Sequence, residues 1–299
     1  GAPAADLRLV RMATAVLVGA SPLLVFALMR AGGASRFAAG HGMAAAAVMP
    51  EAVLVLAKGI ACNVFGMFVT MLAVLACVRR VAIPALAGLL AVACLSHAGA
   101  AVALALLLVL WWTAQRVSGE LDQRRFVGQL AALAAAAAFA WLVYYREVSA
   151  VLAPTGVPTN PAVGQIRWFR VGKIAQDLLL KFGLLPLVVA AIGLRGAVPP
   201  ALRALVWSWL AVGLGLALVA VLSPFPLRFE YFLVPAVAVA AGLGAAEWAA
   251  RRGGRDRALT VVWTATFALQ ALLGALLLHD RFEIIAVIME SPRWPFPFR

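Results

Sequence analysis

Long apolar runs follow one another along the whole chain, and short polar or basic stretches separate them. About 20 predominantly apolar residues are enough for one helical crossing of a bilayer. On this rule the sequence predicts an all-α polytopic integral membrane helical bundle with about nine transmembrane spans. The expected spans are 9–29, 60–78, 81–95, 99–114, 126–145, 183–194, 201–222, 230–249 and 257–278.

Two of these runs are short for a complete crossing. We expect 81–95 to be tilted or broken, with Ser96-His97 at the break, and 183–194 to begin earlier, near Asp177, as an interfacial helix. Because no polar tract interrupts the pattern, residues 1–299 are predicted to form a single transmembrane domain. Its larger extracytoplasmic parts are the loop 146–182, with a short interfacial helix, and the tail 280–299.

Composition supports the membrane class. The chain has 65% hydrophobic residues, 12% charged residues and a mean hydropathy of +1.00. An ordinary soluble domain has about 45–50% apolar and about 25% charged residues. A soluble protein this apolar would lack the polar groups to cover its surface, whereas in a bilayer the extra apolar side chains face lipid. Composition therefore excludes an ordinary soluble domain.

The net charge of +13 has a topological explanation. Lys and Arg cluster between apolar runs rather than along one polar face, which argues against nucleic acid and favours membrane lipids as partners. Cytoplasmic loops carry an excess of basic residues, so we expect a multi-pass protein of the cell membrane with a cytoplasmic N-terminus and an extracytoplasmic C-terminus. The basic residues assigned to the cytoplasmic side are Arg8, Arg11, Arg79, Arg80, Arg116, Arg124, Arg125, Arg195, Arg203, Arg251, Arg252, Arg255 and Arg257.

Motifs of soluble enzymes are absent from the sequence. It has no phosphate-binding loop, no dinucleotide-binding glycine pattern and no zinc-protease or hydrolase motif, and its three cysteines lack metal-ligand spacing. No cofactor or metal is predicted. The spans also lack acidic residues at their centres, which proton- or ion-coupled transporters usually keep. This weakens a transport function.

Polar residues gather at breaks on the expected outer face. His97 lies in the break between two apolar runs, where it binds a phosphate, helps to transfer a proton, or simply caps a helix end. Arg228, Glu230 and Tyr231 lead into the eighth span. An arginine at this position can bind a lipid phosphate through two hydrogen bonds, or pair with the glutamate and anchor the helix.

A third basic group lies within the loop 146–182. Arg167, Arg170 and Lys173 follow one another at a spacing of about one helical turn, which is typical of an interfacial amphipathic helix. Such a helix either holds an anionic lipid head group or anchors the chain to anionic lipid.

This layout resembles the GT-C superfamily of membrane glycosyltransferases. The resemblance covers about residues 60–250 and lies in Leu95-Ser96-His97, the outer loop after Tyr144-Tyr145, and the stretch from Arg228 to Pro235. It implies a polyprenyl-phosphate-linked sugar as substrate and a basic face that holds the phosphate leaving group. It also implies a carboxylate in the first large outer loop, which takes the proton of the acceptor hydroxyl.

Glu51 is the candidate base because residues 30–59 contain neither an aspartate nor a paired acidic motif. A helix start after Pro50 explains the same glutamate without catalysis. Since the chain begins at Gly1 rather than methionine, we expect either a GT-C-like enzyme or the C-terminal portion of one. The alternative is a non-enzymatic membrane subunit of a larger complex, docked on its partner through residues 282–299; a transporter is the third hypothesis.

Overall fold

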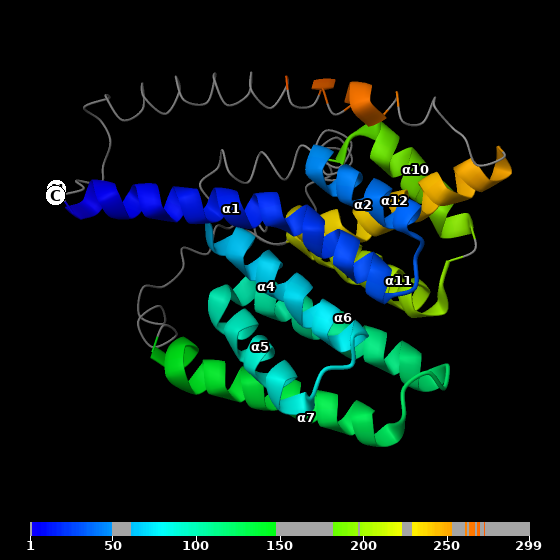
Figure 1. Cartoon of the computed structure of the whole chain (residues 1–299). Helices are drawn as coiled ribbons and strands as arrows, with labels where there is room; N and C mark the ends of the chain where they lie inside the picture. The colour runs from blue at the N-terminus through cyan, green and yellow to red at the C-terminus, as the bar shows by residue number, and fades with distance from the viewer. Residues whose placement is uncertain are drawn as a thin grey trace.

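The structure is a computed structural model that describes residues 2–49, 61–147, 182–196, 198–222 and 229–252, together with individual residues between 261 and 272. Within these ranges all regular structure is helical and no strand is present. The helices lie side by side in a bundle (Figure 1). The elements are α1 (Ala2–Ala31), α2 (Arg36–Val48), α4 (Ala61–Val78), α5 (Ile83–Ser96), α6 (Ala98–Val117), α7 (Gln123–Ala140), η1 (Trp141–Tyr145), α10 (Leu184–Arg195), α11 (Pro200–Leu222), η3 (Phe229–Leu233) and α12 (Val234–Arg251).

Five helices in the described ranges are long and apolar enough to cross a membrane: Met12–Ala31, Ala98–Val117, Gln123–Tyr145, Pro200–Val219 and Tyr231–Arg251. Three apolar helices are shorter, at Asn63–Val78, Ile83–Ser96 and Leu184–Arg195. The prediction of a helical protein with several helices able to span a membrane is therefore confirmed for the described residues, whereas nine complete crossings are not. The predicted break at Ser96-His97 is also confirmed, because α5 ends at Ser96 and α6 begins at Ala98.

Helix α12 forms the centre of one half of the bundle. Within its spanning segment 83% of the residues are buried, compared with 22% for α1. It packs between α2 and α10, and its alanines and glycines allow both neighbours to approach backbone to backbone. A Cβ atom added to Gly242 would lie 2.7 Å from the backbone nitrogen of Gly42 in α2, and one added to Gly244 would lie 2.8 Å from that of Gly193 in α10. Small residues at helix crossings are a common device of membrane bundles, where dispersion contacts replace the hydrophobic effect.

Helices α4, α5, α6 and α7 form the other half. Helix α5 packs against both α4 and α7, and α6 completes the group with the fully buried Trp111 and Trp112. At one end the Arg125 guanidinium donates a hydrogen bond of 3.1 Å to the carbonyl oxygen of Val81, which ties the start of α7 to the α4–α5 turn. Asp122 caps α7 by accepting a hydrogen bond of 2.8 Å from the backbone N–H of Arg125.

Helix α2 lies in a segment that the sequence analysis assigned to an outer loop, residues 30–59. Helices α1 and α2 are antiparallel: Gly42 meets Met29, and Ala46 borders the same cavity as Val25. The C-terminal end of α1 consequently lies beside the start of α11, where Gly32 contacts Leu202.

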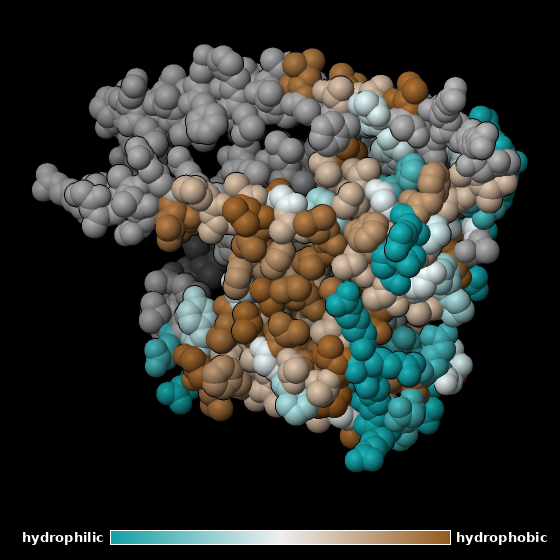
Figure 2. All heavy atoms as spheres, in the orientation of Figure 1, coloured by the Kyte–Doolittle hydropathy of each residue, from teal (hydrophilic) through white to brown (hydrophobic). Residues whose placement is uncertain are grey.

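Except for Arg146 after η1, and Arg8 and Arg11 in α1, the arginines of the described helix ends gather at one end of the bundle. They are Arg30, Arg36, Arg79, Arg80, Arg116, Arg124, Arg125, Arg195, Arg203, Arg251 and Arg252. We call this the arginine end. It appears as hydrophilic surface beside a broad hydrophobic face (Figure 2).

The first helix corrects the predicted topology. Its C-terminal end lies at the arginine end, so its N-terminal end, with Arg8 and Arg11, lies at the opposite end of the bundle (Figure 1). The sequence analysis placed those two arginines on the same side as Arg79-Arg80, and this placement is wrong. The physical reason is α2, an additional helix that reverses the chain once more before α4.

Candidate functional site at the His97 end

His97 joins α5 to α6 at the end opposite to the arginines. Its backbone is extended, with φ −168° and ψ 128°, and its Nδ1 atom accepts a hydrogen bond of 3.3 Å from the backbone N–H of Ala100. This bond assigns the proton of the neutral ring to Nε2. Burial lowers the pKa of His97 below its ordinary value, because desolvation disfavours the imidazolium. The structure therefore shows His97 as a helix cap through Nδ1, and its lowered pKa favours the neutral ring with an N–H donor at Nε2.

Gly66 of α4 allows the break to pack into the bundle. A Cβ atom at this glycine would lie 2.9 Å from the Cβ of Ala100 and 3.2 Å from the Oγ of Ser96. The Ser96 hydroxyl donates a hydrogen bond of 2.6 Å to the carbonyl oxygen of Ala93, which closes the last turn of α5. The His97 junction is thus fixed on both sides by local contacts.

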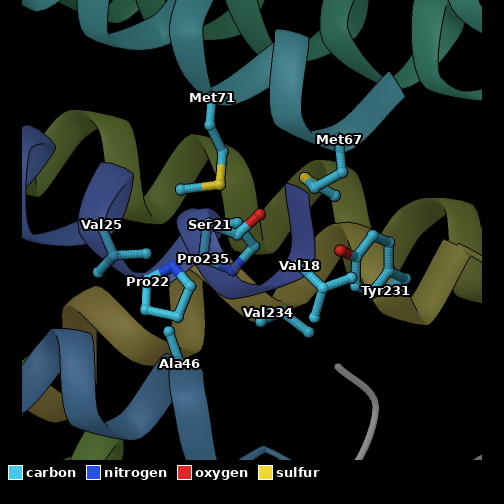
Figure 3. A pocket seen from close by; sticks show the side chains of 10 residues that line it. All are labelled: Val18, Ser21, Pro22, Val25, Ala46, Met67, Met71, Tyr231, Val234 and Pro235. Carbon is cyan, nitrogen blue, oxygen red and sulfur yellow. The ribbon is translucent and has the colours of Figure 1, made fainter. Parts of the chain in front are cut away.

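Tyr231 belongs to η3 and is buried, with 5% of its surface exposed. Its neighbour Phe232 accepts a hydrogen bond of 2.7 Å, through the backbone carbonyl, from the indole Nε1–H of Trp209 in α11. The side chain of Tyr231 lines an internal cavity rather than the surface (Figure 3). The side chain of Glu230, the preceding residue, lies outside the described parts of the chain.

The cavity beside Tyr231 lies between α1, α2, α4 and α12 and has a volume of about 20 Å³, enough for one water molecule. Pro22, inside α1, has no N–H to donate to the carbonyl of Val18, and both residues line the cavity. The hydroxyl of Ser21 donates a hydrogen bond of 2.9 Å to the carbonyl of Leu17. The cavity is thus a small irregularity at a proline within a packed helix, too small for an organic ligand.

The structure brings two of the predicted polar groups together. Gly66 of α4 contacts the His97 junction, and the next residue, Met67, lines the cavity beside Tyr231. Helix α6 also contacts η3 directly. The break at His97 and the entry to α12 therefore border the same stretch of α4.

Several predicted site residues lie outside the described parts of the chain, namely Glu51, Arg167, Arg170, Lys173 and Arg228. The described residues nearest to them in sequence are Met49, Glu147, Phe182, Leu222 and Phe229. Each of these belongs to a helix end that lies opposite to the arginine end.

A groove between α6 and α7 opens next to His97, and the sequence analysis did not predict it. Its volume is about 520 Å³. One hydrogen bond of 2.8 Å, from the Tyr145 hydroxyl to the Cys94 carbonyl oxygen, ties the end of α7 to α5 beside the groove. The lining residues are Cys94, Ala98, Ala101, Val102, Ala105, Leu133, Ala137, Ala140, Trp141 and Tyr145. Alanines at helical spacing in both walls were the available signal, but they also fit close helix packing.

Within the described part of the chain, no group of three or more His, Cys, Asp or Glu side chains is placed to hold a metal ion. No protein-family model, curated protein or solved structure matches the chain. What the protein does must therefore be argued from its residues and their geometry.

Proposed function

We propose that the chain is a GT-C-like membrane glycosyltransferase, or a portion of one, that handles a polyprenyl-phosphate-linked sugar at the His97 end. The observation that carries the proposal is the convergence of the His97 junction and the η3 entry to α12 at one end of an apolar bundle. The segments with Arg167, Arg170, Lys173 and Arg228 are joined to helices at this same end.

Two features of the His97 junction suit a phosphate group. A neutral His97 that accepts at Nδ1 keeps its Nε2–H as a donor, and a hydrogen bond to a charged acceptor contributes about 1.5–3 kcal/mol. The junction also forms the N-terminus of α6, where the helix dipole and the first backbone N–H groups favour an anion. In this proposal the basic residues hold the phosphate as the glycosyl bond breaks, and a carboxylate, Glu51 by the family resemblance, removes the proton of the acceptor hydroxyl.

Binding of a polyprenyl phosphate to the full chain in nanodiscs tests the proposal, with the corresponding polyprenol as the ligand that lacks the charge. We expect the wild type to prefer the phosphate. The variant His97→Asn retains a good helix-capping side chain but loses the imidazole, so it separates capping from ligand binding. We expect it to lower the preference about tenfold, the equivalent of one hydrogen bond to a charged group.

The matched control is His41→Asn, which changes a half-buried histidine of α2 that bonds to the Phe37 carbonyl and has ring contacts with Phe37 and Trp263. Its phosphate preference should equal that of the wild type. A wild type that binds phosphate and polyprenol equally, or a His97→Asn protein that keeps the full preference, refutes the proposal. If the proposal is refuted and a protein partner co-purifies with the chain in stoichiometric amount, this result supports the alternative of a non-enzymatic membrane subunit.

A further inference from the structure

Both walls of the groove between α6 and α7 are apolar helices of membrane-spanning length. Ala98–Val117 and Gln123–Tyr145 are two of the helices long and apolar enough to cross a bilayer. Alanines from facing stripes of the two helices form half of the lining, and their small side chains leave the space open. A volume of about 520 Å³ is typical of a site that holds a small molecule or one hydrocarbon chain, and it is too large for a packing defect.

Water is a poor occupant of this groove. A buried water molecule needs two to four polar partners. The lining offers few, and the hydroxyl of Tyr145 already donates to the carbonyl of Cys94. In a bilayer an apolar space open to the side is filled by hydrocarbon.

The length of the groove indicates which hydrocarbon fills it. From Leu133 to Tyr145 the wall formed by α7 and η1 advances at most about 18 Å, and the α6 wall from Ala98 to Ala105 advances about 10 Å, at about 1.5 Å per residue. One leaflet supplies about 15 Å, half of the hydrocarbon core of a bilayer. The volume of about 520 Å³ lies within the range of sites that hold one small ligand. Both the length and the volume fit one acyl chain of a common phospholipid.

We infer that the α6/α7 groove is a binding site for one acyl chain of a phospholipid from the leaflet at the His97 end. The chain enters between Ala98 and Tyr145 and ends near Ala105 and Leu133, at the middle of the membrane. The head group then lies beside Tyr144 and Tyr145, in the aromatic zone typical of a membrane interface. This inference does not depend on the proposed glycosyltransferase activity.

A photoactivatable phospholipid tests the inference. The full chain is placed in phosphatidylglycerol vesicles that contain a small fraction of phosphatidylglycerol with a diazirine on its acyl chain. After illumination, mass spectrometry maps the labelled residues. In the wild type we expect the residues of the two groove walls to be labelled more strongly than the outward face of α7.

Two pairs of variants locate the label. Ala137→Trp fills the groove from α7, and Ala135→Trp makes the same change at an exposed alanine of the same helix that does not line the groove. Val102→Trp and Leu106→Trp form the corresponding pair on α6, with wild-type exposures of 53% and 47%. We expect the two groove variants to reduce groove labelling to the level of the outward face and the two controls to leave it unchanged. The second pair keeps the test valid if one groove variant does not fold.

Three results overturn the inference. One is uniform labelling of both faces of α7 in the wild type. Another is groove labelling that neither Ala137→Trp nor Val102→Trp reduces. The third uses a polyprenyl phosphate that carries the same diazirine. If this lipid labels the groove more strongly than the phospholipid does at equal concentration, the groove is a site for a polyprenyl chain. That result would leave the proposed function intact, so the two tests are distinguishable.

Discussion

The crossing of α10 and α12 provides the sharpest test of the fold. In Gly244→Ala the new methyl group would meet the carbonyl of Val189 and lie 2.8 Å from the backbone nitrogen of Gly193. Both contacts are with backbone, so no side-chain rotation relieves them. Overpacking of a dense interior costs about 1–3 kcal/mol, and alanine recovers about 0.5–1 kcal/mol relative to glycine in a helix. Because the obstacle is backbone, we expect the upper part of this range and a net loss of about 2 kcal/mol.

Thermal unfolding in detergent, followed by tryptophan fluorescence, measures the effect. A loss of about 2 kcal/mol corresponds to a fall in Tm of about 4 °C or more for a chain of this size. The control is Gly215→Ala in α11, because nothing lies within 4 Å of a Cβ atom at that position. The control should unfold at the wild-type temperature or slightly above it. If Gly244→Ala is as stable as Gly215→Ala, α10 and α12 do not cross at these residues.

Three further predictions follow from the His97 end and the chain direction. Tyr145→Phe removes the hydrogen bond to the Cys94 carbonyl and should cost about 1 kcal/mol of stability in the same assay. The lowered pKa of His97 means that the unfolded chain binds a proton more readily than the folded protein does. The contribution of His97 to the stability of the folded protein is therefore complete above the ordinary pKa of histidine and is lost as the pH falls below it. From about pH 7 to about pH 5, the Tm of the wild type should fall more than the Tm of His97→Asn. A protease site added before Ala2 and one inserted at Arg80 should be cut from opposite sides of sealed vesicles; cleavage from the same side contradicts the path of α1.

The helices that sequence predicts well are those whose length and composition both match a membrane crossing. The run 201–222 corresponds to α11, and 99–114 lies within α6, because each is long, apolar and bounded by polar or proline residues. The break at His97 was also predictable, since a serine and a histidine interrupt an otherwise apolar stretch. These features depend on local sequence alone.

The groove depends on information that local sequence does not contain. Its walls become a site only because α6 and α7 both pack on α5 while leaving space between their alanine stripes. The alanine run 131–138 fits close packing and an open groove equally well until the neighbours of α7 are known. Helix neighbours in a bundle follow from the summed fit of many small contacts, which hydropathy does not report.

Helix α2 shows how one missed element changes the topology of the whole N-terminal part. Its 13 residues span about 20 Å, less than the about 30 Å of a hydrocarbon core, so the length rule for spans does not find it. Two local signals were nevertheless present. Ser35 caps the helix by accepting a hydrogen bond of 3.1 Å from the N–H of Ala38, and alanine, the residue with the highest helix propensity, fills six of its 13 positions.

The consequence of α2 concerns charge as well as shape. With α2 counted, α1 and α4 run in the same direction, and the described arginine-rich turns share one end while the start of α1 faces the other. On the positive-inside rule, the combined weight of several short turns predicts a cytoplasmic arginine end, against the two arginines near the N-terminus. The His97 junction, the α6/α7 groove and the start of α1 consequently share the opposite side. A bundle with this polarity would present its apolar groove and His97 to the leaflet opposite the arginine end.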